Sequence, residues 1–208
     1  MSVVNQLASQ FNRNDEEPNI ELAHKFANEE NHAAIEEIIE NLYCKDKKIQ
    51  HDCIKVAYEI GQVKPELISK YALNFIELLK SRNNRMVWGA MSALATIADE
   101  ASETLMAHVS TIKNAIKMGS VITIDKGVLT LAKLAAVSKE NNHAIFPFLL
   151  LHLENCRTKE IPQHAESTLL AVTDENKEAF LNVLRKRDTY LTAPQLKRVK
   201  KIYKQLEA

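Results

Sequence analysis

Residues that form tight turns are scarce in this sequence. Its 208 residues include only 4 glycines and 5 prolines. A protein built mainly from β-sheet needs more of both, because glycine and proline supply the backbone conformations of reverse turns. Alanine, leucine, glutamate and lysine are abundant instead, and all four favour helices. The composition therefore argues against a β-rich protein and predicts an all-α fold.

Cysteine and long apolar runs are scarce as well. The 3 cysteines, Cys44, Cys53 and Cys156, are an odd number in a chain large enough to bury its own core, which predicts reduced thiols in a cytoplasmic protein. No apolar run is long enough to cross a bilayer. The stretch "MSVVNQLASQFNRNDEEPN" lacks the charged and apolar regions of a secretory signal, so we expect neither a signal nor a membrane contact.

An excess of charge of one sign is also absent. The 27 Lys and Arg residues balance the 27 Asp and Glu residues. A dedicated nucleic-acid-binding protein usually carries a basic excess, so the balance argues against one. The scattered glycines cannot form a phosphate-binding loop, and no nucleophile elbow occurs. We therefore predict no catalytic residues, no cofactor and no enzymatic activity.

One set of side chains has spacing compatible with a metal site. His152 and Cys156 are four residues apart on a predicted helix, and His164 could lie close to them. The sequence has no CxxC pair, no HExxH and no paired set of ligands. From the sequence alone we therefore predict no metal.

Four similar helical segments recur at nearly even spacing. They read "HDCIKVAYEIGQ" from His51, "VWGAMSALATIA" from Val87, "DKGVLTLAKLAA" from Asp125 and "QHAESTLLAVTD" from Gln163. When the segments are stacked, apolar residues share columns, one of which holds Ala57, Ala93, Leu131 and Leu169. Internal repeats of this length are typical of helical solenoids.

A second helical pattern precedes each of these segments. Apolar residues fall on one side of a 3.6-residue helix at Ile35–Leu42, Ala72–Leu79 and Phe146–Leu153, more weakly at Val109–Ile116, and a fifth stripe begins at Phe180. Polar breakers separate the stripes, and Pro65, Pro147, Pro162 and Pro194 are expected at helix boundaries. The pattern predicts successive helix pairs and essentially no sheet.

The pairs resemble the HEAT/armadillo class of helical repeats. In "KDKKIQHDCIKVAYEIG" the positions that a HEAT repeat favours are filled by Asp46, Ile49, Cys53, Ala57, Ile60 and Gly61. Gln50 stands where an arginine is usual, and the later copies are degenerate. The resemblance covers roughly residues 31–184. It implies an all-α, right-handed α-α superhelix whose second helices line a concave face, and most such folds are binding scaffolds.

The ends of the chain are predicted to cap the repeats. Residues 1–30 should form two capping helices, at Val3–Phe11 and Ile20–Phe26, and residues 185–208 a basic capping helix. Terminal repeats need a polar outer face. We therefore expect a single domain over residues 1–208, with the repeats at 31–184.

The side of each second helix opposite its apolar stripe is the predicted binding surface. Trp88, the only tryptophan, points nearly opposite the stripe of its helix. The predicted partner-binding residues are Asp52, Glu59, Trp88, Ser92, Lys126, Thr130, Lys133 and His164. A surface of mixed charge around one aromatic is typical of a protein or peptide groove. Trp88 could instead pack against a neighbouring second helix, because large aromatics are usually mostly buried. Gly89 is expected to permit close helix approach.

The C-terminal end is rich in basic residues. They are Arg185, Lys186, Arg187, Lys197, Arg198, Lys200 and Lys201. The plain interpretation is the solvated outer face of a capping helix. The alternative is an end that contacts nucleic acid, an acidic protein or another copy of the chain.

An alternative function follows from a weaker resemblance. In size and helical-repeat fold the chain is similar to bacterial DNA glycosylases for alkylated bases, which implies concave aromatics and an acidic residue. Here Trp88 is the one aromatic on the predicted face, and Asp52, Asp99 and Asp125 are the candidate acids. We predict a non-catalytic scaffold that binds a protein or peptide partner. The alternative is a nucleic-acid-binding or glycosylase-like module that uses Lys126, Lys133 and the C-terminal lysines.

Overall fold

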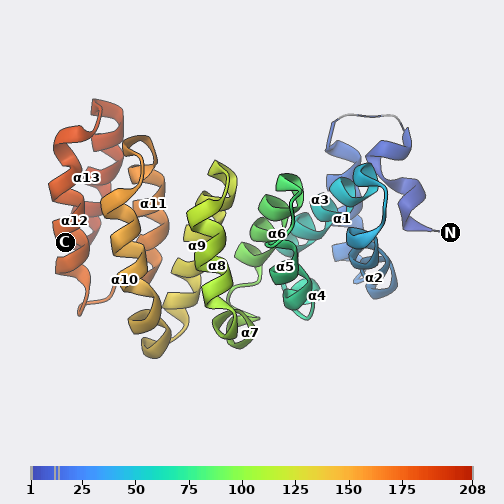
Figure 1. Cartoon of the computed structure of the whole chain (residues 1–208), viewed down its shortest axis with the longest axis horizontal. Coiled ribbons are helices and arrows are strands. Elements are labelled where there is room, and N and C mark those ends of the chain that lie inside the picture. The colour runs from blue at the N-terminus through green and yellow to red at the C-terminus, as the bar shows by residue number, and fades with distance from the viewer. Residues whose placement is uncertain (1, 12, 14, 208) are drawn as a thin grey trace. The chain divides into compact units, whose positions relative to one another are not determined.

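The computed structural model describes residues 2–11, 13 and 15–207, and these residues contain helices but no β-strand. The α-helices are α1 (Glu17–Asn28), α2 (His32–Glu40), α3 (Lys47–Val63), α4 (Glu66–Ser69), α5 (Ala72–Leu78), α6 (Asn84–Thr96), α7 (Ser102–Ala107), α8 (Val109–Met118), α9 (Val121–Val137), α10 (Lys139–Asn155), α11 (Ile161–Thr168), α12 (Lys177–Arg187) and α13 (Ala193–Glu207). Figure 1 shows these helices in order along the chain. The predicted all-α fold is confirmed.

The chain divides into two compact units, residues 1–127 and 128–208. The predicted helix pairs correspond to α2 with α3, α4 and α5 with α6, α7 and α8 with α9, and α10 with α11; the fifth stripe lies on α12, and α13 lies within the predicted capping segment. The boundary between the units falls inside α9. A single domain over the whole chain stays a prediction, and each unit is described by itself below.

In the first unit, α3 lies between two neighbouring helices. It packs against α1 on one side and α6 on the other, while α2 packs on α3 and α5 packs on α6 (Figure 1). Asp46 caps the start of α3 by accepting a hydrogen bond from the Lys48 amide at 2.8 Å, and Asn83 caps α6 in the same way through the Arg85 amide at 3.1 Å. A carboxylate or amide oxygen at this position satisfies an amide that the helix itself leaves unpaired.

The apolar stripes predicted for α3 and α6 form the core of the first unit. Ile54, Ala57, Ala90 and Ala93 are all fully buried. Gly89 lies at the contact between α3 and α6. A Cβ added to Gly89 would stand 2.6 Å from Ile54 Cγ1. The expected close approach at Gly89 is therefore confirmed.

Of the two expected N-terminal helices, Ile20–Phe26 lies within α1 as predicted, whereas Val3–Phe11 does not form a single α-helix. Residues before α1 form two short 3-10 helices, Val3–Gln6 and Ala8–Phe11. Side chains hold this segment in place: buried Asn19 accepts from the Ala8 amide at 3.0 Å, and Asp52 on α3 accepts from the Ser9 amide at 2.8 Å. These hydrogen bonds join residues far apart in sequence, so the helical spacing of the segment could not reveal them.

In the second unit, α10 packs against α11 and α12, and α13 packs against both α11 and α12. Pro147 lies inside α10, not at a boundary as predicted. The helix begins earlier because Ser138 caps it, accepting from the Asn141 amide at 3.1 Å. The exposed Pro147 therefore removes one backbone donor from the interior of the helix.

Among the described residues, no helix combines the length and the apolar character that a membrane crossing requires. The predicted cytoplasmic location stays a prediction.

Candidate functional site

Trp88 is partly exposed on α6 and contacts two side chains of different chemistry. Its ring centroid lies 6.1 Å from that of Tyr58 on α3, with the two planes tilted by 47°. The Arg85 guanidinium lies over the ring, with Cζ 4.1 Å from the centroid. A cation in this position is attracted by the negative face of the indole. Trp88 therefore packs against Tyr58 of a neighbouring second helix, as one interpretation of the sequence expected. Part of its surface also stays exposed, as a binding residue requires.

Charged side chains surround these rings. Glu16 pairs with both Arg85 and Lys55, the latter at 3.1 Å, and Glu59 pairs with Lys55 at 2.6 Å. The Lys55 side chain is only 8% exposed, and its ammonium also lies 4.9 Å from the centre of the Tyr58 ring. We call these six residues the Trp88 cluster; they are Glu16, Lys55, Tyr58, Glu59, Arg85 and Trp88.

The electrostatics of the Trp88 cluster favour its charged state. Burial by itself lowers the pKa of Lys55, but the hydrogen bond to Glu59 and the interactions with Tyr58 and Glu16 outweigh burial and raise that pKa. Burial likewise opposes ionisation of Glu16, yet hydrogen bonds from Arg85 and Lys55 lower its pKa overall. Both groups are therefore charged at neutral pH, and their geometry is held by opposite charges.

Sequence reasoning found Glu59 and Trp88 but missed the other four members. Local spacing contains part of the signal, because Lys55 precedes Tyr58 by three residues and Glu59 by four, and Arg85 precedes Trp88 by three. Glu16 could not be found in this way, because it reaches α3 and α6 from outside the repeats.

A solvent-open cavity of about 390 Å³ adjoins the Trp88 cluster. Its walls include Glu16 and Arg85 of the cluster, together with Asp15, Lys48 and Asp52. Asp52 is one of the predicted partner-binding residues, and both of its carboxylate oxygens are engaged: it accepts from the Ser9 amide at 2.8 Å and from Asn19 Nδ2 at 2.8 Å. Asp52 therefore attaches the N-terminal segment to α3.

Three of the predicted partner-binding residues are buried, which corrects their expected exposure. Ser92 is 7% exposed, and Thr130 and His164 are fully covered. Ser92 Oγ donates to the Trp88 carbonyl at 2.8 Å, within its own helix. The prediction failed here because the buried arc of a second helix is wider than the apolar stripe. Lys126 is exposed and Lys133 is partly exposed, and their contact with a partner stays a prediction.

The predicted basic end divides into paired arginines and exposed lysines. Arg185 pairs with Glu207 at 2.6 Å, and Arg198 pairs with Glu166 through two hydrogen bonds. Arg187 donates to backbone carbonyls at the end of α10, so it serves the fold. Lys186 is exposed, and four further lysines lie along α13, namely Lys197, Lys200, Lys201 and Lys204. Within the described chain these four form no ion pair, and a nucleic-acid contact by this end stays a prediction.

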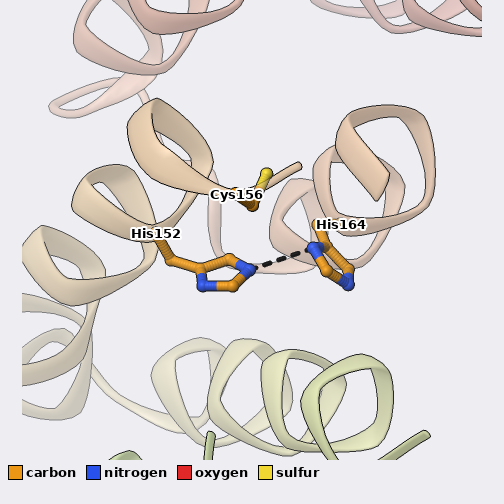
Figure 2. A group of neighbouring side chains, drawn as sticks. All are labelled: His152, Cys156 and His164. Atoms are coloured by element: carbon orange, nitrogen blue, oxygen red, sulfur yellow. Dashed lines mark hydrogen bonds between the residues drawn. The ribbon is translucent and has the colours of Figure 1, made fainter. Parts of the chain in front are cut away.

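The second unit brings together the three metal-ligand residue types noted in the sequence. His152 lies on the last turn of α10, Cys156 caps that helix, and His164 lies on α11. The ligand atoms of these three residues all lie within 4.8 Å of one another. Figure 2 shows the two imidazoles facing each other across a hydrogen bond of 2.9 Å between His152 Nε2 and His164 Nδ1. We call these residues the histidine–cysteine cluster.

Burial raises the pKa of two of the three cysteine thiols. Burial raises the pKa of Cys156 to about 11, although Arg187 opposes the shift. Burial also raises the pKa of Cys53 strongly. Both thiols are protonated at neutral pH, so neither is a reactive nucleophile on its own. All three cysteines are free.

Comparisons with proteins of known structure identify the type of fold. No family model matches the sequence, and no curated protein matches it. An engineered protein of known structure is 18% identical, with a TM-score of 0.69 over 100% of this chain and 97% of that one. A designed armadillo repeat protein in complex with the peptide (KR)4 is 15% identical, with a TM-score of 0.67 over 96% of this chain and 87% of that one.

A natural helical-repeat protein matches as well. The karyopherin Kap121p, bound to the SUMO protease Ulp1p, is 13% identical, with a TM-score of 0.66 over 95% of this chain and 22% of the karyopherin. At these identities the likeness concerns the fold. The chain has an armadillo/HEAT-type helical repeat fold, as its helix pairs predict.

Proposed function

We propose that this chain is a binding scaffold that recognises a protein or peptide through the surface of α3 and α6 at the Trp88 cluster. The observation that carries the proposal is the position of Trp88, which is partly exposed between Tyr58 and the Arg85 guanidinium. Tryptophan, tyrosine and arginine are the residue types that most often dominate binding energy at protein interfaces.

The rigidity of the Trp88 cluster supports the same function. Tyr58 is 7% exposed and lies beside the Trp88 ring, while the Arg85 guanidinium that pairs with Glu16 lies over the face of that ring. Side chains that are already ordered lose less conformational freedom when a partner binds. The cluster therefore offers an aromatic anchor without a large cost of ordering.

Two of the similar structures support this class of function. The designed armadillo repeat protein was solved in complex with a peptide, and the karyopherin was solved bound to a protein. For this chain we propose an extended peptide segment that carries one apolar anchor residue for Trp88. The adjoining cavity carries both signs of charge, on Lys48 and Arg85 and on Asp15 and Glu16, so the flanking residues of the peptide should also be of mixed charge.

Trp88 provides its own reporter for a test, because it is the only tryptophan. A library of such peptides is screened against the wild-type chain, and each binder is titrated while tryptophan emission is followed. Replacing Trp88 with Ala should weaken binding by about 2 kcal/mol, or roughly thirtyfold in Kd, as measured by calorimetry. Tyr190→Ala is the matched control, because Tyr190 is an aromatic that is 67% exposed in the second unit.

The outcomes separate the two interpretations of Trp88. Equal affinity of the folded Trp88→Ala variant and the wild type would contradict the proposal. If Trp88→Ala unfolds, Trp88→Phe keeps a ring against Tyr58 and is titrated in its place. A mobility shift of DNA or RNA at low salt, without any peptide binding, would favour the nucleic-acid alternative.

A further inference from the structure

We propose that His152, Cys156 and His164 form a binding site for a single zinc ion that links the end of α10 to α11. Two imidazole nitrogens and one thiolate are ligands that zinc prefers, at bond lengths of about 2.0–2.1 Å to nitrogen and about 2.3 Å to sulfur. The site would keep one coordination position for water. This proposal revises the expectation of no metal drawn from the sequence.

The geometry already approaches that of a zinc site. In a tetrahedral site with these bond lengths, two nitrogens stand roughly 3.3 Å apart, and a nitrogen and a sulfur roughly 3.6 Å apart. Here the two nitrogens are 2.9 Å apart, and all three ligand atoms lie within 4.8 Å of one another. The rings therefore need to separate by a few tenths of an ångström, and the sulfur needs to move inward by about one ångström.

Under this proposal the sulfur makes that movement by rotation of the Cys156 side chain. In Figure 2, Sγ of Cys156 points away from the pair of rings, so rotation about its Cα–Cβ bond brings it closer. The rotation gives up a long contact of 3.8 Å with the Leu153 carbonyl. The Cys156 amide donates to the His152 carbonyl at 2.7 Å, which closes the last turn of α10 and keeps the two residues one turn apart.

Side chains around the cluster hold its backbone in place. Arg187 on α12 donates to the carbonyls of Leu153 at 3.0 Å and of Cys156 at 2.9 Å. The buried Glu160 is held by Arg157 and interacts electrostatically with His164.

The residue types select the class of metal. Nitrogen and sulfur ligands favour zinc and its neighbours over magnesium and calcium, which prefer several oxygen ligands. The cluster itself contains no carboxylate. Zinc also has no electronic preference of geometry, so it tolerates a site with three protein ligands. Cobalt(II) is the spectroscopic probe, because cobalt bound to a thiolate gives a charge-transfer absorption band.

The experiment uses the full chain without an affinity tag, stripped of metal with a chelator. Zinc is titrated calorimetrically, and cobalt is titrated while the thiolate-to-cobalt band is followed. We expect one zinc ion per chain, a rise in melting temperature with zinc, and a cobalt band that excess zinc abolishes. Absence of saturable binding at one ion per chain in the wild type would overturn the proposal.

Matched variants test whether the three residues are the ligands. Cys156→Ser should abolish the cobalt band and weaken zinc binding at least about tenfold, and His152→Gln should weaken it similarly. Cys44→Ser and His143→Gln are the controls, because Cys44 lies far along the chain and His143 is an exposed histidine on α10 itself. A cobalt band that persists in Cys156→Ser would refute the assignment, and so would equal loss in the controls. If Cys156→Ser does not fold, His152→Gln and the stoichiometry of the wild type decide.

Discussion

Gly89 sets how closely α3 and α6 approach each other. It is buried on α6, and any side chain there would enter the space of Ile54 on α3. The neighbouring Trp88 depends on this approach, because its ring meets Tyr58 of α3. One residue without a side chain therefore determines both the core contact and the position of the proposed anchor.

Replacing Gly89 with Ala should destabilise the chain by about 1–3 kcal/mol, because the added Cβ would stand 2.6 Å from Ile54 Cγ1 and the packed core cannot absorb it. The measurement is urea unfolding followed by circular dichroism. In the background of Ile54→Ala, which removes the clashing atoms, the same substitution should cost less. Additive effects of the two changes would contradict the clash.

At the scale of elements, the N-terminal segment is held to the repeats by side chains rather than by an apolar stripe. Asp52 on α3 accepts hydrogen bonds from the Ser9 amide and from Asn19, which is itself only 1% exposed. The segment also carries Glu16 to Arg85 and Lys55. A predicted partner-binding residue thus connects the first 3-10 helices to the proposed site.

Replacing Asp52 with Ala should destabilise the chain by about 1–3 kcal/mol, because it leaves the buried Asn19 amide group without its acceptor. Amide hydrogen exchange should also speed up in residues 2–11. Asp99→Ala, an exposed aspartate on the same unit, is the control and should change neither measurement. Unchanged exchange at Ser9 in Asp52→Ala would show that the segment is held by other contacts.

At the scale of the whole molecule, carboxylates paired with cations occur in both units. Hydrogen bonds to Lys64 lower the pKa of Glu30, and hydrogen bonds to Lys139 and His143 lower the pKa of Glu175. Burial opposes the shift at Glu16, but its pairing with Arg85 and Lys55 lowers its pKa too. Their ordinary value is 4.5. A lowered pKa in the folded state means that the unfolded chain takes up protons first as the pH falls.

The contribution of these pairs to stability should therefore be fully present above pH 4.5 and be lost as the pH falls through the lowered pKa values. Urea unfolding at a series of pH values should show stability declining on the acid side of this point. In Glu16→Gln the decline should be shallower, because one titrating pair is gone. A steeper decline in that variant would contradict a lowered pKa of Glu16 in the folded chain.

The helix pairs were predictable because their signal is local. The stripes of α3 and α6 repeat every three or four residues, and Asp46 and Asn83 stand where caps are expected. Pro147 was misplaced, because α10 begins at the Ser138 cap and continues past the proline to Asn155. For the candidate site, Trp88 and Glu59 were predictable from their place on the helix, whereas Glu16 was not.

The sequence by itself determined the all-α class and the residues of the apolar stripes, because both depend on composition and on spacing within each helix, and the even recurrence of similar segments indicated successive helix pairs. Only the tertiary structure decided which side chains meet across helices. It buried Thr130 and His164, brought Glu16 to Arg85, and set His164 beside His152. The physical reason is that burial and ion pairing depend on which helices pack together, and the spacing within a single helix does not contain that information.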